Sequence, residues 1–443
     1  MSPQPDPAVR PDASRAQADV DVVVVGAGLA GLRCALAVQD AGLSVRVLER
    51  ADAVGGRVRT DRVDGFLLDR GFQLLNPSYP ALRRGIDVEA LGLQSFDAGV
   101  AARTESGLAR LGHPWHAPRL IPSSARGVLP DALDGIRLAR WLRPLLRRPG
   151  RPLRPGLDAR ADAPLRESLD AAGVGGLPRR VIDAFLAGVV LDDTGATSTH
   201  YAHLLVNSFV AGTPGLPRAG MQALPEQLAA RLHRPVETGV TVLEVRAGAT
   251  PRVRTEAGEI RARHVVVATD GATAAALAGT PAPAPRGVVT TWFTTPTAPV
   301  AGRRARLLHV DAREVPRGPL VNVAVVSAAA PTYAPAGRHL VAASALLDTA
   351  AGRVPSDDAL RDHAGGLLGT PVSDWEVVHR YEIPFALPAQ PPPLRAAQPV
   401  GAGEGVLVCG DHRDTASIQG ALVSGERAAR HLLRTLGAGR VAA

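Results

Sequence analysis

Three glycines near the start of the chain have the spacing of a phosphate-binding turn. Gly26, Gly28 and Gly31 form a Gly-x-Gly-x-x-Gly sequence, and Glu49 lies 18 positions after the last of them. The first glycine permits a tight turn, the second lets the backbone approach a pyrophosphate, and the third lets a helix pack closely on a strand. A carboxylate at the position of Glu49 accepts hydrogen bonds from a ribose diol. The four residues therefore predict a dinucleotide site.

The flanking sequence supplies the elements that position such a site. Residues 21–25 are a β-branched run that predicts a strand, residues 32–41 are largely apolar and predict a helix, and residues 44–48 predict a second strand. A helix that opens at Leu29 and Ala30 would present free N–H groups and a partial positive charge to the phosphates. The order strand, glycine turn, helix, strand, acid distinguishes this segment from a chance glycine motif.

A second glycine-rich loop follows at once. Its predicted cofactor contacts are Arg50, Gly55, Gly56 and Arg57. A guanidinium here can bridge phosphate oxygens. The loop and residues 64–73 resemble the extended fingerprint of the flavin amine oxidase and phytoene desaturase superfamily, whose members bind FAD. The resemblance implies that residues beside the flavin ring are Gly71, Phe72 and Gln73.

A C-terminal block is similar to the second flavin motif of the same superfamily. Residues 405–411 predict a buried strand that ends in Gly410 and Asp411, and a helix is expected from about 417 to 436. Asp411 would hold a ribityl or phosphate-side hydroxyl. The helix would direct its N–H groups, and the positive end of its dipole, at the flavin edge that gains negative charge on reduction. The cofactor contacts implied at its start are Ser417, Ile418, Gln419 and Ala421.

The resemblance also implies the fold class and the domain organisation. Residues 216–225, 240–245 and 265–269 look like the returning half of a FAD domain, in which the backbone of Val242 meets the adenine. We therefore expect an α/β protein with a discontinuous Rossmann-type FAD-binding domain and an α+β substrate-binding domain. The expected segments are a flexible tail (1–19), the FAD-binding domain (20–85, 215–275 and 400–443) and the substrate-binding domain (86–214 and 276–399).

Composition narrows the chemistry and the partners. The 443 residues include 50 arginines and no lysine, which excludes a lysine Schiff base or a lysine-held water. Two cysteines fit a reducing, cytoplasmic location, and no segment has the ~20 apolar residues of a membrane span. Aromatic residues make up only 3% of the chain, which argues against nucleic-acid stacking platforms. The histidine pairs lack a third ligand at a known spacing, so no metal is expected.

The net charge of +8 is concentrated in the segment 131–154. Seven arginines and no acid lie between Arg137 and Arg154. Arginines and leucines recur there on different faces of a predicted amphipathic helix over 131–148, which Pro144 would kink or end. Two interpretations stay open: a peripheral membrane-surface helix that admits a lipid-soluble substrate, and a solvated lid on the substrate domain.

The substrate side offers fewer signals. Residues 379–388 precede the C-terminal motif, as the substrate-facing strand of the superfamily does, and Tyr381 and Phe385 could wall a pocket over the flavin. Tyr381 and Arg70 are the candidate catalytic residues. Cys409 directly precedes Gly410, where a flavin thioether is not expected, so we expect non-covalent FAD.

The reaction implied is transfer of a hydride from a substrate C–H to flavin, with oxygen or a quinone as the electron acceptor. The absence of lysine and the few aromatic residues favour dehydrogenation of a small apolar, isoprenoid-like or polycyclic substrate. Oxidation of an amine to an imine is the alternative. A flavin-dependent isomerase and a non-catalytic flavoprotein also stay open.

Overall fold

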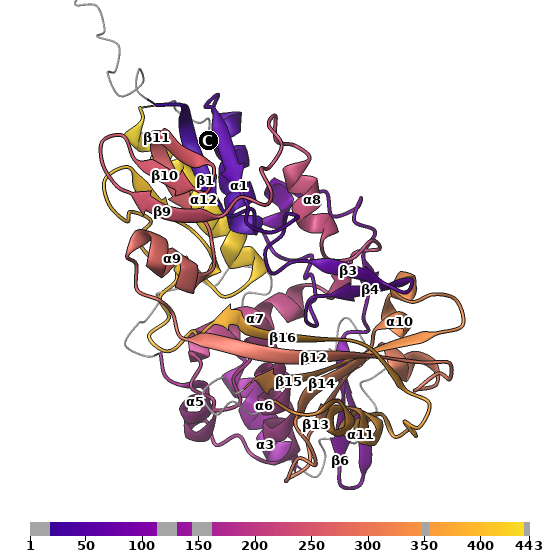
Figure 1. Ribbon diagram of the computed structural model, residues 1–443. Coiled ribbons are helices and arrows are strands. Elements are labelled where there is room, and N and C mark those ends of the chain that lie inside the picture. The colour runs from indigo at the N-terminus through magenta and orange to yellow at the C-terminus, as the bar shows by residue number, and fades with distance from the viewer. Residues whose placement is uncertain (1–17, 113–130, 144–161, 348–353, 438–443) are drawn as a thin grey trace, which may run out of the picture.

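The computed structural model describes residues 18–112, 131–143, 162–347 and 354–437 (Figure 1). Most of the predicted tail 1–19, and the arginines of the basic segment beyond Arg143, lie outside the described residues. The described chain forms two lobes, each built on its own β-sheet.

The first lobe contains a parallel sheet with the strand order β2-β1-β11-β17. Its strands are β1 (Val20–Val25), β2 (Val45–Leu48), β11 (Gly258–Val267) and β17 (Val406–Val408). The first half of β11 also pairs antiparallel with β10 (Arg252–Thr255), which pairs with β9 (Val242–Arg246). Both faces of β1 are buried, which explains its unbroken valine run.

Helices cover both faces of this sheet. Val22 and Val24 face the core that contains α1 (Leu29–Asp40) and α12 (Ile418–Thr435), whereas Val23 and Val25 face the core beside α9 (Gly271–Ala278). The two helices α1 and α12 approach so closely that a Cβ on Gly425 would lie 2.1 Å from the carbonyl oxygen of Ala30. The prediction of an α/β fold is confirmed, and the helix and strand around the glycine turn begin and end close to the predicted residues.

The second lobe is a seven-stranded mixed sheet with the order β16-β12-β15-β14-β13-β6-β7. Its strands are β6 (Gly99–Thr104), β7 (Gly107–Gly112), β12 (Pro285–Thr295), β13 (Leu308–Asp311), β14 (Leu320–Val325), β15 (His339–Leu347) and β16 (Glu376–Pro388). One face packs on α11 (Asp357–Leu368). The helices associated with the other face are α3 (Ala132–Trp141), α5 (Leu165–Ala171), α6 (Gly176–Val190) and α7 (Thr199–Ala211).

Short elements join the two lobes. They are the hairpin β3 (Thr60–Val63) and β4 (Phe66–Asp69), the pair β5 (Gln94–Ser95) and β8 (Gly215–Leu216), and the helices α8 (Ala223–Ala229) and α10 (Val326–Ala329). The largest buried cluster contains Val22 of β1 together with Trp292 and Ala342 of the second sheet, so one apolar core continues from lobe to lobe.

The described part of the basic segment is a helix that ends earlier than predicted. Helix α3 spans Ala132–Trp141, and Leu138, Trp141 and Leu142 pack into a core with α5 to α7. Of the leucines expected on its apolar face, Leu138 and Leu142 are thus turned inward, and the others lie outside the described residues. Leu133 and Ile136 of the same helix are exposed, and contact with a membrane stays a prediction. Over the described ranges, no helix combines the length and the hydrophobicity required to cross a membrane.

A carboxyl buried between the lobes makes stability depend on pH. Asp69 is fully buried and accepts hydrogen bonds from the Thr60 hydroxyl (2.5 Å), the Met221 N–H (3.0 Å) and the Tyr333 hydroxyl (2.9 Å). Burial outweighs these bonds and raises the pKa of Asp69 from 3.8 to about 6. Because the folded-state pKa lies above the unfolded value, this contribution to stability is complete below pH 4 and is lost as the pH rises through 6.

We expect Asp69→Asn to remove this dependence, since an amide mimics the neutral acid and Tyr333 can reverse its hydroxyl to accept from it. Wild type should lose about 3 kcal/mol relative to the variant between pH 3 and pH 7. Urea unfolding of both proteins across this range measures the difference. A difference that stays constant with pH would contradict the assignment.

Candidate cofactor and substrate site

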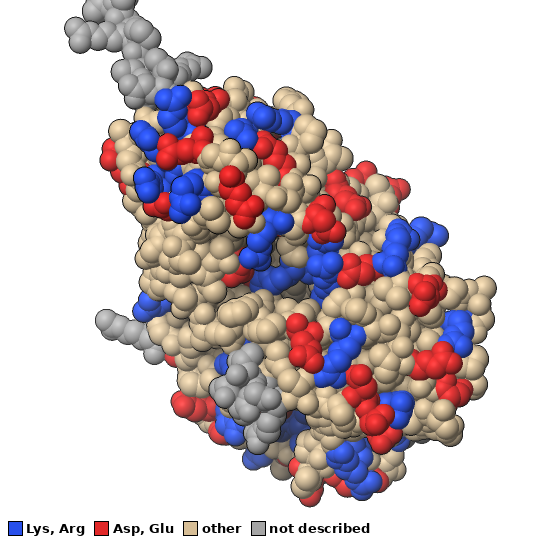
Figure 2. All heavy atoms as spheres, viewed as in Figure 1, with Lys and Arg blue, Asp and Glu red and all other residues tan. Residues whose placement is uncertain are grey.

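A cavity of about 850 Å³ lies between the two lobes and is lined by residues from both. In Figure 2 a hollow with basic side chains beside it separates the upper and lower parts of the molecule. Eighteen of the predicted cofactor residues line this cavity. They are Gly26, Gly28, Leu29, Ala30, Glu49, Arg50, Gly55, Gly56, Arg57, Gly71, Phe72, Gln73, Val242, Gly410, Asp411, Ser417, Ile418 and Ala421.

The glycine turn has the geometry of a cradle. Gly26 has φ +104°, and a Cβ there would lie 2.9 Å from the Ala268 oxygen. A Cβ on Gly31 would lie 2.0 Å from the Gly26 oxygen, so this residue permits close packing of α1 and does not itself line the cavity. By contrast, a Cβ on Gly28 would meet no atom within 4 Å, because Gly28 borders the open cavity.

The acid at the end of β2 is held beside this turn. Glu49 accepts hydrogen bonds from the Ala27 N–H (2.8 Å) and the Ala51 N–H (2.9 Å). These bonds fix the carboxylate between the glycine turn and the second loop. The Gly55 N–H in turn donates to the Ala27 oxygen (2.9 Å), which joins the two glycine-rich segments.

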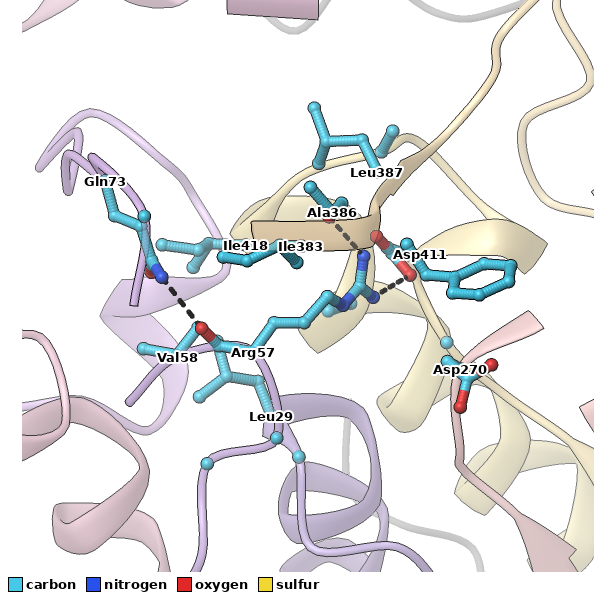
Figure 3. Close-up of a pocket in the computed structure, with 18 of the residues that line it drawn as sticks. Leu29, Arg57, Val58, Gln73, Asp270, Ile383, Ala386, Leu387, Asp411 and Ile418 are labelled. Carbon is cyan, nitrogen blue, oxygen red and sulfur yellow. Dashed lines mark hydrogen bonds and ion pairs between the residues drawn. The ribbon is translucent and has the colours of Figure 1, made fainter. Parts of the chain in front are cut away.

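Arg57 crosses the cavity between the motifs from the two ends of the chain (Figure 3). Its Nη2 donates to Asp411 Oδ1 (2.6 Å) and its Nη1 donates to the Ala386 oxygen (2.8 Å), while its own carbonyl accepts from Gln73 Nε2 (2.7 Å). Burial works against the charge, but the attraction and hydrogen bond of Asp411 raise the pKa of Arg57 above its ordinary value. The guanidinium therefore stays positive inside the cavity.

The N-terminus of α12 points toward the same space. Ser417 caps it by accepting from the Gly420 N–H (3.0 Å), and Ile418 and Ala421 line the cavity. Gln419 does not line it: its Oε1 accepts from the Ala81 N–H (2.9 Å), so in this structure the side chain tethers a neighbouring loop.

The two candidate catalytic residues share one carboxylate. Arg70 lines the cavity and donates to both oxygens of Asp61 (2.9 Å each), and the Tyr381 hydroxyl donates to Asp61 Oδ2 (2.6 Å). Tyr381 is absent from the cavity lining, so the expectation that it walls the pocket is corrected; Phe385, four residues further along β16, does line it. Burial and then Asp61 raise the pKa of Tyr381, which stays protonated.

Sequence reasoning missed several lining residues. Asp270 follows β11 and caps α9 by accepting from the Ala272 and Thr273 N–H groups (3.0 Å each). An Asp-Gly pair directly after a buried strand is a recognisable helix start, so this residue could have been found. The missed residues that matter for the substrate half come from α6 and its C-cap, from α7 and from the second sheet, and they carry no local motif: Phe185, Gly188, Val189, Leu191, Tyr201, Leu205, Phe209, Val288, Leu308, Asn322, Ser344 and Ile383.

The first lobe has a parallel sheet with a glycine turn at a helix N-terminus, and the cavity beside this turn extends to the second lobe. This is the architecture of a dinucleotide-dependent oxidoreductase. Residues 29–433 match the family of flavin-containing amine oxidoreductases. The chain therefore belongs to this family of flavin-containing oxidoreductases. In the described ranges, no three His, Cys, Asp or Glu residues are grouped so as to hold a metal ion.

Individual relatives share only part of the sequence. The chain is 46% identical to putrescine oxidase of Kocuria rosea over 76 residues, which are 17% of this chain and 16% of that protein. It is 44% identical to 4,4'-diapolycopene oxygenase of Methylomonas sp. over 54 residues, 12% and 11% of the two chains. The matches thus span about one sixth or less of these relatives, and they include both an amine oxidase and an enzyme named for a polyene.

A solved structure matches over far more of the chain. Cyclohexylamine oxidase from Brevibacterium oxydans superposes with a TM-score of 0.67 at 18% identity, covering 95% of this chain and 100% of that one. At this identity the similarity establishes the fold and leaves the substrate open.

Proposed function

We propose that the protein binds FAD non-covalently in this cavity and dehydrogenates an apolar, isoprenoid-like or polycyclic substrate. The observation that carries the proposal is the chemistry of the cavity wall contributed by the second lobe. All three acidic residues of the lining (Glu49, Asp270 and Asp411) belong to the first lobe, among the cofactor motifs. Among the described residues, those that line the cavity from 185–209 and 288–387 include no acid.

The residues of the first lobe fit FAD. The open face of Gly28 can admit a pyrophosphate, Glu49 can accept from a ribose, and Arg57 supplies a positive charge. The lining contains no Cys or His among the described residues, and both Cys34 and Cys409 are buried elsewhere. These observations support non-covalent attachment.

The second lobe supports an apolar substrate. Side chains such as Phe185, Phe209 and Leu205 form much of the wall, and the two phenylalanine rings contact edge to face with centroids 5.2 Å apart. A protonated amine buried here would have no carboxylate to offset the loss of its hydration, which is costly. A hydrocarbon has no such penalty and gains from burial.

When bound, FAD supplies the capacity to accept a hydride from the substrate. The chain's own part is to hold the substrate against the flavin edge, to exclude water with the apolar wall, and to place the positive end of the α12 dipole where negative charge develops. Arg70 and Tyr381 act at most by positioning Asp61 and the neighbouring residues 71–73, since both already bind that carboxylate.

Anaerobic bleaching of the flavin absorbance tests the proposal. We expect detergent-dispersed polyenes or other isoprenoids to bleach the holoprotein, and primary and secondary amines to leave it oxidised. Bleaching by amines alone would overturn the proposal in favour of amine oxidation. Product formation without bleaching would indicate an isomerase. After bleaching, reoxidation by air or by a quinone would identify the acceptor.

A further inference from the structure

A row of polar residues runs across one face of the second sheet, and two of its four members line the substrate half of the cavity. Tyr381 on β16 lies opposite Thr290 on β12, Thr290 lies opposite Ser344 on β15, and Ser344 lies opposite Asn322 on β14. Residues directly opposite one another in antiparallel strands project from the same face of a sheet. Ser344 and Asn322 line the cavity.

The two lining residues differ in how their polar atoms are satisfied. Ser344 is 2% exposed, and its hydroxyl shares a hydrogen bond with the Thr290 hydroxyl (3.0 Å). Asn322 is 5% exposed, and its Oδ1 has no hydrogen-bond partner in the described structure. A buried amide oxygen without a partner is destabilising, so it calls for a partner such as a bound water or a ligand group.

Helix α6 leaves room for this amide. Gly188 packs over Asn322, and a Cβ there would lie 2.5 Å from Asn322 Nδ2. Gly188 also lines the cavity, with Val189 beside it. The amide thus occupies a gap between β14 and α6, surrounded by side chains that offer it no bond.

We propose that Asn322 and Ser344 together bind a single neutral hydroxyl group of an otherwise apolar substrate. The inference rests on the proposed function and names its substrate class: a long apolar alcohol. Asn322 Oδ1 is an acceptor, so the ligand contributes an O–H donor, and the Ser344 hydroxyl can donate to the ligand oxygen. The lining residues that the structure describes in the second lobe include no acid, so we assign an uncharged donor. Because a site built to bond a hydroxyl rejects its deoxy analogue, the pair sets specificity.

A matched pair of ligands and three variants test the site. The ligands are the C15 alcohol farnesol and the C15 hydrocarbon β-farnesene, titrated calorimetrically into anaerobic holoprotein in the same detergent. The variants are Asn322→Leu, Ser344→Ala and the control Thr291→Val. Thr291 neighbours the row on β12 but is bonded to Asp357 (2.8 Å) and does not line the cavity.

We expect wild type to bind farnesol about tenfold more tightly than β-farnesene, and Asn322→Leu to abolish this preference by weakening the alcohol alone. Ser344→Ala should reduce it less, and Thr291→Val should leave it unchanged. The ligand-free melting temperature of Asn322→Leu should equal or exceed that of wild type, because an unpaired buried oxygen is removed.

Four results would overturn the proposal. For wild type, these are binding of neither ligand and equal binding of both. For Asn322→Leu, they are an equal loss of affinity for both ligands and an unchanged preference for the alcohol. The last result would assign the amide to bound water. If Asn322→Leu does not fold, the wild-type preference and Ser344→Ala decide. The outcome is separable from the proposed function: alcohol preference without bleaching by any polyene would refute dehydrogenation and keep the site.

Discussion

Replacing Gly28 by alanine should strongly weaken FAD binding and leave the apoprotein folded. Gly28 has extended backbone angles (φ −74°, ψ 177°) that any residue adopts, and an added Cβ would meet no atom within 4 Å. In the holoprotein the same Cβ would occupy the space where the backbone must approach the pyrophosphate. Loss of two charge-assisted hydrogen bonds corresponds to roughly 100-fold weaker binding. Quenching of FAD fluorescence on titration measures the affinity.

Gly31→Ala is the matched control with the opposite phenotype. Its Cβ would lie 2.0 Å from the Gly26 oxygen, so α1 must move away from β1 and the apoprotein itself should be destabilised. Thermal unfolding of the two apoproteins separates the effects. If Gly28→Ala bound FAD as wild type does, the turn would not be the pyrophosphate site; if it melted like Gly31→Ala, the role of Gly28 would be structural.

The second large effect is expected from Arg57→Met, which should weaken both the fold and FAD binding. The variant leaves the Asp411 carboxylate, 6% exposed, without its cation. Removing one partner of a buried pair is strongly destabilising. The Arg57 side chain is 37% exposed because it borders the cavity, so screening reduces the loss to about 2 kcal/mol. FAD affinity should fall at least roughly tenfold with the loss of a phosphate-binding charge.

The double variant Arg57→Met/Asp411→Asn distinguishes the two roles. Because it removes the uncompensated charge, it should recover most of the lost unfolding free energy, measured by urea denaturation of the apoprotein. It should not recover FAD binding. Recovery of both properties would show that Arg57 serves only to neutralise Asp411.

Most of the predicted cofactor residues line the cavity, and they could be recognised because each belongs to a short continuous pattern. Gly26 to Glu49 is one strand, turn, helix and strand, and these elements form as expected because backbone geometry and capping act over a few residues. Gln419 shows the limit of such reasoning: it belongs to a recognised helix start, but its place on the helix turns it to the Ala81 N–H and away from the cavity.

The substrate half of the site could not be predicted in this way. Tyr381 lies on the expected strand and on the same row as the cavity residues, but the register of β16 places it against Asp61. The basic segment has the predicted amphipathic pattern, yet no periodicity specifies whether its apolar face meets a bilayer or α6. Trp141 packs inward because the cluster that receives it is assembled from α5 to α7.

The sequence by itself determined the phosphate turn, the acid after β2, the helix at the flavin motif and hence the cofactor class, since each depends on neighbours along the chain. Only the tertiary structure decided which side chains meet in the substrate half of the cavity. Asn322 and Ser344 are 22 residues apart and became neighbours through the register of two strands. Packing alone gives them a shared face, leaves the gap at Gly188 and leaves the Asn322 amide oxygen without a partner. No local pattern encodes them, because the residues that create that environment come from separate elements.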